Sequence, residues 1–261
     1  MVNNYLILLP PSEGKNKGGD ESKPYRIIQN LKKYNTFISL NSEREFILEK
    51  LKQLISIVNE KELESVFELK GKNLQEAIEI NLDLLNEETM PSIGRYDGVM
   101  FKSIDYKKMS EAQKNNFNFS VLFIDGMFGL LKPQDFIPEY KLKITSKIGD
   151  INITNYWKTN LRPYFKMLFK DKLIIDLLPE AHRKVIDFNE EDNYISIKFC
   201  ELKNSKLVNV GHDSKKLKGE IINYITSFEN IKINDLKNFK DMREYKFNEK
   251  YSNEKEIVYL K

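Results

Sequence analysis

Cysteine and histidine are scarce in this sequence, which has Cys200, His182 and His212 and no other residue of either kind. A single cysteine cannot form a disulfide within the chain. A zinc site of cysteine and histidine, or a Cys–His nucleophile, would have almost no residues to use. A hard cation bound by carboxylates remains open, but we assign no residue to a metal and expect no cofactor.

Proline and glycine are also sparse, at 8 and 11 of 261 residues, and no short motif recurs at a fixed spacing, which excludes collagen-like, low-complexity and repeat architectures. No run approaches 18 apolar residues, and the first residues lack the basic segment of a signal peptide, so we expect no membrane partner and a cytoplasmic location. The hydrophobic content of 41% is enough for a substantial core. We expect one domain over residues 1–261.

Charge is plentiful, at 31% of residues, but 42 basic side chains nearly balance 39 acidic ones. The net charge of +3 therefore says little about partners. The distribution is more informative, because residues 51–100 hold 5 basic and 10 acidic side chains, whereas residues 141–172 hold eight basic and two acidic ones. Two interpretations of this basic second half stay open, a solvated lysine-rich surface and a face that binds a polyanion.

Periodicity and capping residues predict a mixture of helices and strands. We expect helices over 43–58, 60–68 (capped by Asn59), 74–85, 106–117, 154–168 (capped by Thr154) and 214–228, and strands over 5–9, 119–124, 141–144, 173–178, 194–200 and 205–210, with a hairpin near 244–259. Strands and helices do not alternate strictly. The sequence therefore favours an α+β fold over a doubly wound sheet.

Three of the apolar strands, at residues 5–9, 119–124 and 173–178, are each followed by a polar loop. Binding and catalytic residues gather at strand ends, so these loops are predicted to meet at one edge of a sheet. The alternative is that each loop only satisfies its own backbone. The polar side chains concerned are Ser12, Glu13, Lys15, Asp125 and Glu180.

Several other residues are candidates for anion binding. Arg95 has the planar fork that suits phosphate or carboxylate, although a structural salt bridge is the commoner role. The segment Gly126–Gly129 has the outline of a glycine hairpin, followed by Lys132, but a plain tight turn is the commoner explanation. Lysines interleaved with aromatic residues, or clustered at a helix start, would suit a nucleic acid backbone or could only aid solubility. These are Tyr140, Lys141, Lys143, Lys215, Lys216 and Lys218. His182, two residues after Glu180, has no evident nucleophile to serve as a general base, so a structural role is favoured.

The chain resembles the YaaA family of bacterial peroxide-stress proteins nearly from end to end. The resemblance is carried by the segments Leu8–Lys15, Arg95–Val99, Asp125–Asp135, Pro138–Leu142 and Ile175–Glu180, and by Trp157. It implies a single α+β domain of unusual topology, with a positively charged cleft. It further implies binding of duplex and branched DNA through a helix–hairpin–helix-like element and a role in limiting iron-dependent DNA damage. The family residues carried over are Ser12, Lys15, Arg95, Tyr96, Gly126, Gly129, Lys132, Pro133, Asp135, Tyr140, Lys141, Asp176 and Glu180.

Two functions follow as hypotheses. The first is a DNA-binding protein of the peroxide stress response that contacts phosphates through Lys132, Lys141, Lys143 and the lysines of 215–218. The alternative is an enzyme for a small phosphorylated or nucleotide-like substrate, with Lys15 and Arg95 holding the anion and with acid–base candidates Glu13, Asp125, Asp176 and Glu180. Asp125 stands where the family usually has serine, and its negative charge is expected to weaken phosphate contact there.

Overall fold

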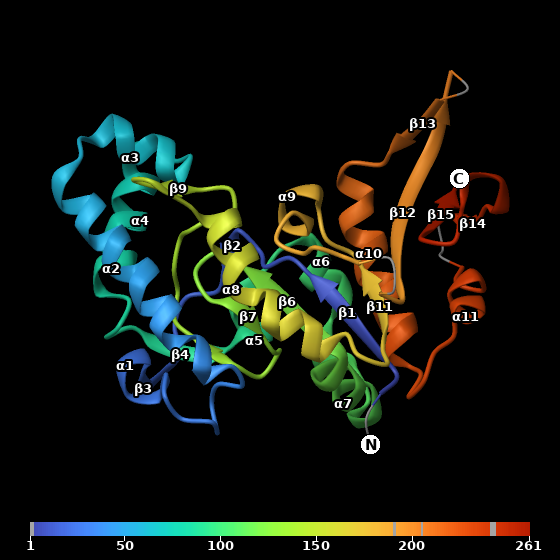
Figure 1. Ribbon diagram of the computed structural model, residues 1–261, viewed down its shortest axis with the longest axis horizontal. Coiled ribbons are helices and arrows are strands. Elements are labelled where there is room, and N and C mark those ends of the chain that lie inside the picture. Colours follow the sequence, from blue (N-terminus) through green and yellow to red (C-terminus); the bar gives the residue numbers. More distant parts are fainter. Residues whose placement is uncertain (1–2, 190–191, 205, 241–243) are drawn as a thin grey trace.

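The main sheet contains eight strands in the part of the chain that the structure, a computed structural model, describes: residues 3–189, 192–204, 206–240 and 244–261 (Figure 1). Its strands are β1 (Tyr5–Leu9), β6 (Val121–Asp125), β7 (Gly129–Leu131), β11 (Leu173–Asp176), β12 (Tyr194–Lys203), β13 (Lys206–Asn209), β14 (Lys246–Phe247) and β15 (Glu256–Leu260). The order is β14-β15-β12-β11-β1-β6-β7, and β13 pairs with β12.

The five strands from β15 to β6 are parallel, whereas β7, β13 and β14 are antiparallel to their neighbours. β1 lies at the centre, where every residue of its sequence YLILL is buried. Such an uninterrupted apolar run is typical of a strand covered on both faces. The expected mixture of helices and strands is confirmed.

Shorter strands and the helices surround this sheet. Small sheets are formed by β2 (Gly14–Lys15) with β5 (Tyr96–Asp97), by β3 (Asp20–Pro24) with β4 (Glu88–Pro91) and β8 (Phe136–Ile137), and by β9 (Lys147–Ile148) with β10 (Ile151–Asn152). The helices are α1 (Tyr25–Ile28), α2 (Asn41–Ile57), α3 (Glu60–Phe67), α4 (Gly71–Asp83), α5 (Ser92–Arg95), α6 (Val99–Ile104), α7 (Glu111–Ser120), α8 (Ile153–Leu168), α9 (Glu180–Arg183), α10 (His212–Thr226) and α11 (Ile233–Lys237). Single 3-10 turns occur at Ile38–Leu40, Tyr106–Lys108 and Glu249–Tyr251.

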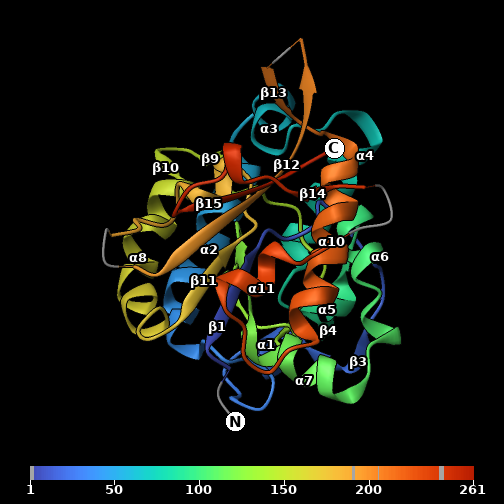
Figure 2. The same cartoon turned by 90° about the vertical axis from the view of Figure 1, so that its right-hand side faces the viewer.

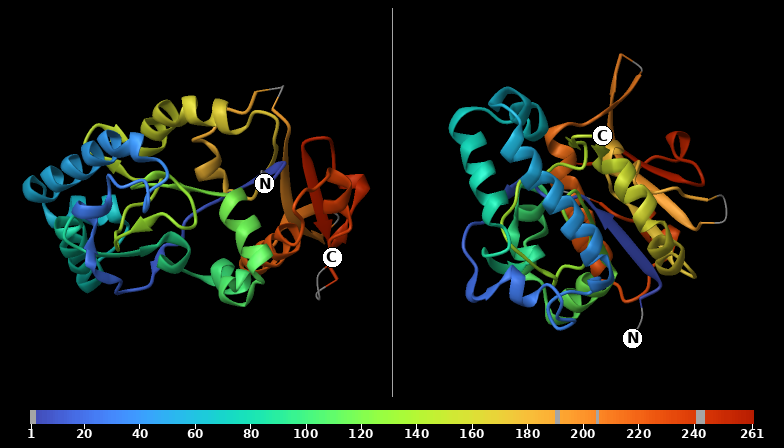
Figure 3. Two further views of the ribbon diagram at one scale, coloured as in Figure 1. Left: turned by 90° about the horizontal axis from the view of Figure 1, so that it is seen from below. Right: turned by 60° about the vertical axis from the view of Figure 1, so that its left-hand side comes forward.

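Helices cover both faces of the sheet, as Figure 2 shows: α6, α7 and α10 lie on one side of β1 and β11, and α8 lies on the other. Helices α2, α3 and α4 form a separate layer at the opposite end of the molecule from α10 and α11 (Figure 3), and acidic residues outnumber basic ones in α3 and α4. One hydrophobic cluster extends from Tyr5 in β1 to Tyr259 in β15. α10 packs closely on α6, because a Cβ placed on Gly219 would lie 2.4 Å from the Ser103 side chain and 2.7 Å from the Met100 carbonyl oxygen.

Most predicted elements are present, and Asn59 caps α3 as expected by accepting a hydrogen bond from the Glu62 amide. Several boundaries differ from the expected ones, and two of them have a clear physical cause. Residue 119 belongs to α7, whose capping box at Ser110 and Gln113 starts a helix that runs to Ser120, so the strand begins at Val121. α8 is capped by Asn152, and it continues through Pro163 as one helix.

The expected strand over 141–144 is also absent. The backbone amide and carbonyl of Lys141 bond to the Asn81 side chain instead of a neighbouring strand. Gly126 packs against the backbone of residues 142–144, which leaves no room for a paired strand on that side. The predicted strand over 205–210 appears as β13, although residue 205 lies outside the described residues.

The close approach of Gly129 to Trp157 generates a prediction. Gly129 has φ +69°, and an added Cβ would lie 2.6 Å from the Trp157 ring, whereas Gly149, with φ +57°, has nothing within 4 Å of that position. We expect Gly129→Ala to lower the free energy of unfolding by about 2–4 kcal/mol and Gly149→Ala by about 1 kcal/mol. Urea denaturation measures both, and equal losses would show that the Trp157 contact is not tight.

Candidate functional site

The carboxyl ends of three adjacent parallel strands, β11, β1 and β6, meet at one edge of the sheet. Polar residues at or after these ends are therefore neighbours, as the sequence predicted. We call the group formed by Lys15, Asp125, Asp176, His182 and Lys218 the strand-end site. Its members come from β2, β6, β11, α9 and α10.

Asp125, the last residue of β6, is fully buried and accepts four hydrogen bonds. One carboxylate oxygen accepts from the backbone amides of Met127 (2.7 Å) and Phe128 (2.9 Å). The other accepts from the hydroxyls of Tyr96 (2.9 Å) and Tyr140. Burial and the neighbouring carboxylate raise the pKa of both tyrosines well above the usual value, so both act as donors.

The expectation that Asp125 weakens phosphate contact at the glycine loop stays a prediction. The carboxylate points into the protein and is fully engaged with internal donors. The loop itself is the turn of a β-hairpin in which Asp125 pairs with Gly129, flanked by β6 and β7 rather than by two helices.

Lys15 lies against this network. β2 pairs with β5 in a register that sets Lys15 opposite Tyr96, and the Lys15 Nζ lies 3.9 Å from the centre of the Tyr140 ring. Its ammonium group donates to the Ser12 carbonyl at 3.1 Å. Burial lowers the pKa of Lys15 to about 8, and the charge of Asp125 opposes that shift.

A second carboxylate, Asp176 at the end of β11, is buried and forms an ion pair with Arg183, whose Nε lies 2.5 Å from Oδ2. The other oxygen accepts from the Leu178 amide at 2.8 Å. Burial raises the pKa of the Asp176 carboxyl, and the positive charge of Arg183 opposes that rise. Lys218 reaches the same place from α10 and donates to the Leu177 carbonyl at 2.7 Å, and burial lowers its pKa to about 8.

His182 completes the site with an imidazole whose Nδ1 is buried and has no hydrogen-bond partner within the described chain. Burial lowers the pKa of His182 to about 4, the charge of Asp125 raises it and that of Lys218 lowers it. The imidazole is therefore neutral at pH 7. Clusters of groups with such altered pKa values are typical of functional sites.

Several predicted residues lie elsewhere or have internal partners. Arg95 is fully buried, and its guanidinium donates to the backbone carbonyls of Asn16, Glu88 and Ile137, so it braces the fold and cannot meet an anion at the surface. Lys132 donates to the Phe119 carbonyl at 2.5 Å.

The remaining acidic candidates have partners outside the strand-end site, although the charge of Glu13 raises the pKa of Lys15 and His182. Glu13 and Glu180 are exposed, and each lies 3.5 Å from a lysine, Lys143 and Lys184 respectively. Lys143 also pairs with Glu68 at 2.7 Å, which leaves less of its charge for a polyanion. Ser12 donates to the Asp97 carbonyl.

The lysines of α10 divide between two environments. Lys215 and Lys216 are exposed, whereas Lys218 turns inward to β11. Sequence reasoning did not find Arg183 and favoured a structural role for His182. The available signal was their position within seven residues of Asp176, in the segment that follows a buried strand.

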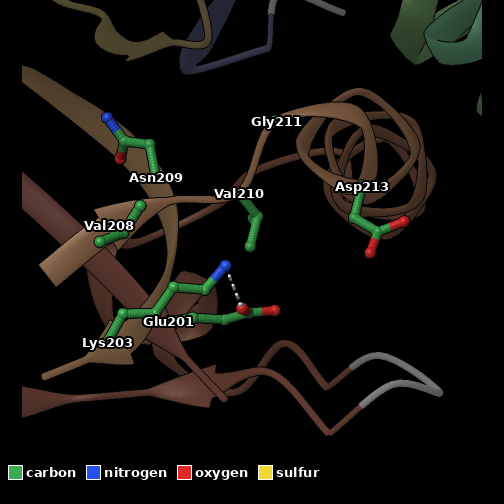
Figure 4. Close-up of a pocket in the computed structure, with 7 residues that line it drawn as sticks. All are labelled: Glu201, Lys203, Val208, Asn209, Val210, Gly211 and Asp213. Carbon is green, nitrogen blue, oxygen red and sulfur yellow. Dashed lines mark ion pairs between the residues drawn. The ribbon is translucent and has the colours of Figure 1, made fainter.

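A surface pocket of about 250 Å³ lies between β12, β13 and the start of α10, apart from the strand-end site (Figure 4). Glu201 and Asp213 line it, and Lys203 is paired with Glu201 at 3.7 Å. Two carboxylates against one paired lysine make this pocket unfavourable for phosphate. Within the described ranges, no group of three or more His, Cys, Asp or Glu is placed to hold a metal ion, and no helix has the length and apolarity to cross a bilayer.

The neutral His182 generates a pH prediction. Its pKa is lowered in the folded protein, so the unfolded chain binds the proton more tightly between about pH 4 and 6.5, and stability falls as the pH drops through that window. We expect His182→Gln to reduce the loss of unfolding free energy between pH 7 and 5 by about 1–2 kcal/mol. Urea titrations at both pH values measure this, and an unchanged loss would contradict a buried neutral imidazole.

Comparison with known proteins finds relatives along nearly the whole chain. The family model described as "Peroxide stress protein YaaA" matches residues 5–251. A UPF0246 protein of Malacoplasma penetrans is 31% identical over 259 residues, covering 98% of each chain. UPF0246 proteins of Rickettsia felis (31% identical, 69% of this chain and 73% of the relative) and Fusobacterium nucleatum (26%, 85% and 92%) are also similar. The chain therefore belongs to the family of the peroxide stress protein YaaA, whose relatives carry the name UPF0246.

Proposed function

We propose that this protein acts in the cytoplasm as a DNA-binding protein of the peroxide stress response and limits iron-dependent damage to DNA. Membership of the YaaA family supports the stress role. The iron-dependent part rests on the resemblance to that family. The DNA-binding part is supported by the placement of lysines on α10.

The observation that carries the proposal is that α10 has both exposed lysines and a lysine that points inward. Lys215 and Lys216 present their charges to solvent, and Lys218, less than one turn further, points to the carboxyl ends of the strands. Positive charge thus continues from the surface to the strand-end site. A phosphate backbone is the ligand that uses both exposed and recessed lysines, because its charges repeat along its length.

Lys215 and Lys216 provide the test of DNA binding. We expect Lys215→Glu with Lys216→Glu to weaken duplex binding and to reduce the slope of log affinity against log salt by about 2, one unit for each lost phosphate contact. Fluorescence anisotropy across a salt series, with duplex, branched and single-stranded DNA, measures both quantities.

The matched control is Lys61→Glu with Lys72→Glu, which makes the same charge change on the exposed surface of α3 and α4, at the other end of the molecule (Figure 1). This variant should lose little affinity and keep its salt slope. An equal loss in both double variants would show that net charge, and not α10, governs binding.

The second candidate is an enzyme for a small phosphorylated or nucleotide-like substrate. It is favoured by the strand-end site, where Lys15 and Lys218 have pKa values of about 8 beside a neutral histidine and two buried carboxylates. Such groups can bind an anion and exchange protons near neutral pH. Arg95 is no part of this candidate, because its donors are already occupied.

The two candidates differ in their sensitivity to mutation. If a small ligand binds at the strand ends, Lys218→Met should lower the affinity for a deoxynucleoside 5′-monophosphate by about tenfold, the usual cost of a lost charge-assisted hydrogen bond. The Lys215/Lys216 double variant should leave that affinity unchanged. Calorimetric titration decides between them, and the reverse order of sensitivities would reject the small-ligand site.

A further inference from the structure

Lys15 differs from the paired lysines of the described chain in the partners of its amino group. Lys17, two residues away, is exposed and forms an ion pair with Glu76. The half-buried Lys15 has a backbone carbonyl on one side and the face of the Tyr140 ring on another, and no carboxylate within ion-pair distance among the described residues. Its nitrogen is thus held in place without a carboxylate that would keep it protonated.

The burial of Lys15, rather than the balance of charges around it, favours the neutral amine. Burial is the main cause of its lowered pKa, and Lys141 lowers it further, whereas Asp125, Glu139 and Glu13 raise it. With a pKa of about 8, about a tenth of the amine is neutral at pH 7, against less than a thousandth for an ordinary lysine. A desolvated lysine of this kind is a nucleophile for carbonyl carbon.

The surroundings hold this amine in a defined position. The β2–β5 register fixes the backbone of Lys15 beside Tyr96, and the hydroxyls of Tyr96 and Tyr140 are both bound to the buried Asp125. Lys141 supplies a second positive charge close enough to affect Lys15. Because Lys141 is close enough to Lys15 for their charges to interact, one ligand that carries both a phosphate and a carbonyl group is able to meet both lysines.

We propose that Lys15 forms a covalent imine with the aldehyde carbon of a phosphate-bearing sugar. The neutral Nζ attacks the carbonyl carbon, and the electron pair of the C=O bond moves to oxygen, which takes a proton. Over the whole reaction the nitrogen gives up both of its protons. The oxygen takes up a second proton and leaves as water, and a C=N bond forms. No oxidant, reductant or metal is needed.

The aldehyde of a phosphate-bearing sugar can come from two sources. One is a free sugar phosphate such as 2-deoxyribose 5-phosphate, and the other is the open-chain sugar at a base-free position in DNA, which is flanked by phosphates. This inference rests on the proposed function, because both need phosphate to bind near the strand ends. It adds the reacting carbon and the residue that attacks it.

Borohydride trapping tests the proposal, because it reduces an imine to a stable amine. The full-length protein is incubated with 2-deoxyribose 5-phosphate, or with a duplex containing one base-free position, and the adduct is located by peptide mass spectrometry. We expect one dominant adduct on Lys15, formed about tenfold faster at pH 9 than at pH 7 as the amine loses its proton. The substrate that is trapped more efficiently identifies the source.

Lys15→Arg keeps the positive charge and cannot form an imine, and Lys17→Arg is the matched control in the same loop. We expect Lys15→Arg to lower trapping by about tenfold or more, and Lys17→Arg to leave it unchanged. Equal thermal unfolding of the two variants shows that both are folded. Adducts spread over many exposed lysines, or trapping retained in Lys15→Arg, would overturn the proposal.

Anisotropy with intact duplex separates this proposal from the DNA-binding function. Normal duplex affinity without trapping by either aldehyde rejects the imine and leaves DNA binding in place. Trapping of 2-deoxyribose 5-phosphate on Lys15 in a protein with no duplex affinity supports the imine and rejects DNA as the ligand.

Discussion

The buried carboxylate of Asp125 is the interaction on which the centre of the molecule depends. It stands at the end of a central strand, where its two oxygens tie the hairpin after β6 to the hydroxyls of two tyrosines from distant segments. Burying a charge is costly unless hydrogen bonds replace water, and here four donors do so. The residues around it, including the strand that carries Lys15, are positioned by this requirement.

The same cost of burying a charge lowers the pKa of the two lysines of the strand-end site, Lys15 and Lys218. The ends of buried strands offer backbone carbonyls that bind ammonium groups, as Leu177 binds Lys218 and Ser12 binds Lys15. These carbonyls are neutral, so they replace water without fully stabilising the charge. The result is a pair of lysines whose protons are held less tightly than usual, beside a histidine that stays neutral.

The sequence identified the apolar strands and the convergence of their loops, because continuous buried strands and the residues that end them are local signals. Asp125 was found in this way, whereas Asp176 was named through the resemblance to the YaaA family. It could not separate Arg95, fully buried against carbonyls, from an arginine free to bind phosphate, since that distinction depends on which segments fold over it. For the same reason the lysines of 215–218 looked alike until the helix showed Lys218 turned inward. The segment 141–144 alternates like a strand, but the side chain of Asn81 takes the backbone hydrogen bonds of Lys141.

The close packing of α10 on α6 at Gly219 bears on how the family can diverge. Any larger residue there would push the two helices apart, since the Ser103 side chain and the Met100 carbonyl already occupy the space of a Cβ. Lys215 and Lys216 on the same helix are exposed, and the Lys216 backbone carbonyl accepts a hydrogen bond from Ser103 that does not depend on the side chain at that position. A substitution at Gly219 therefore changes how α10 lies on α6, whereas substitutions of the Lys215 and Lys216 side chains change only the charge on the outer face of the helix.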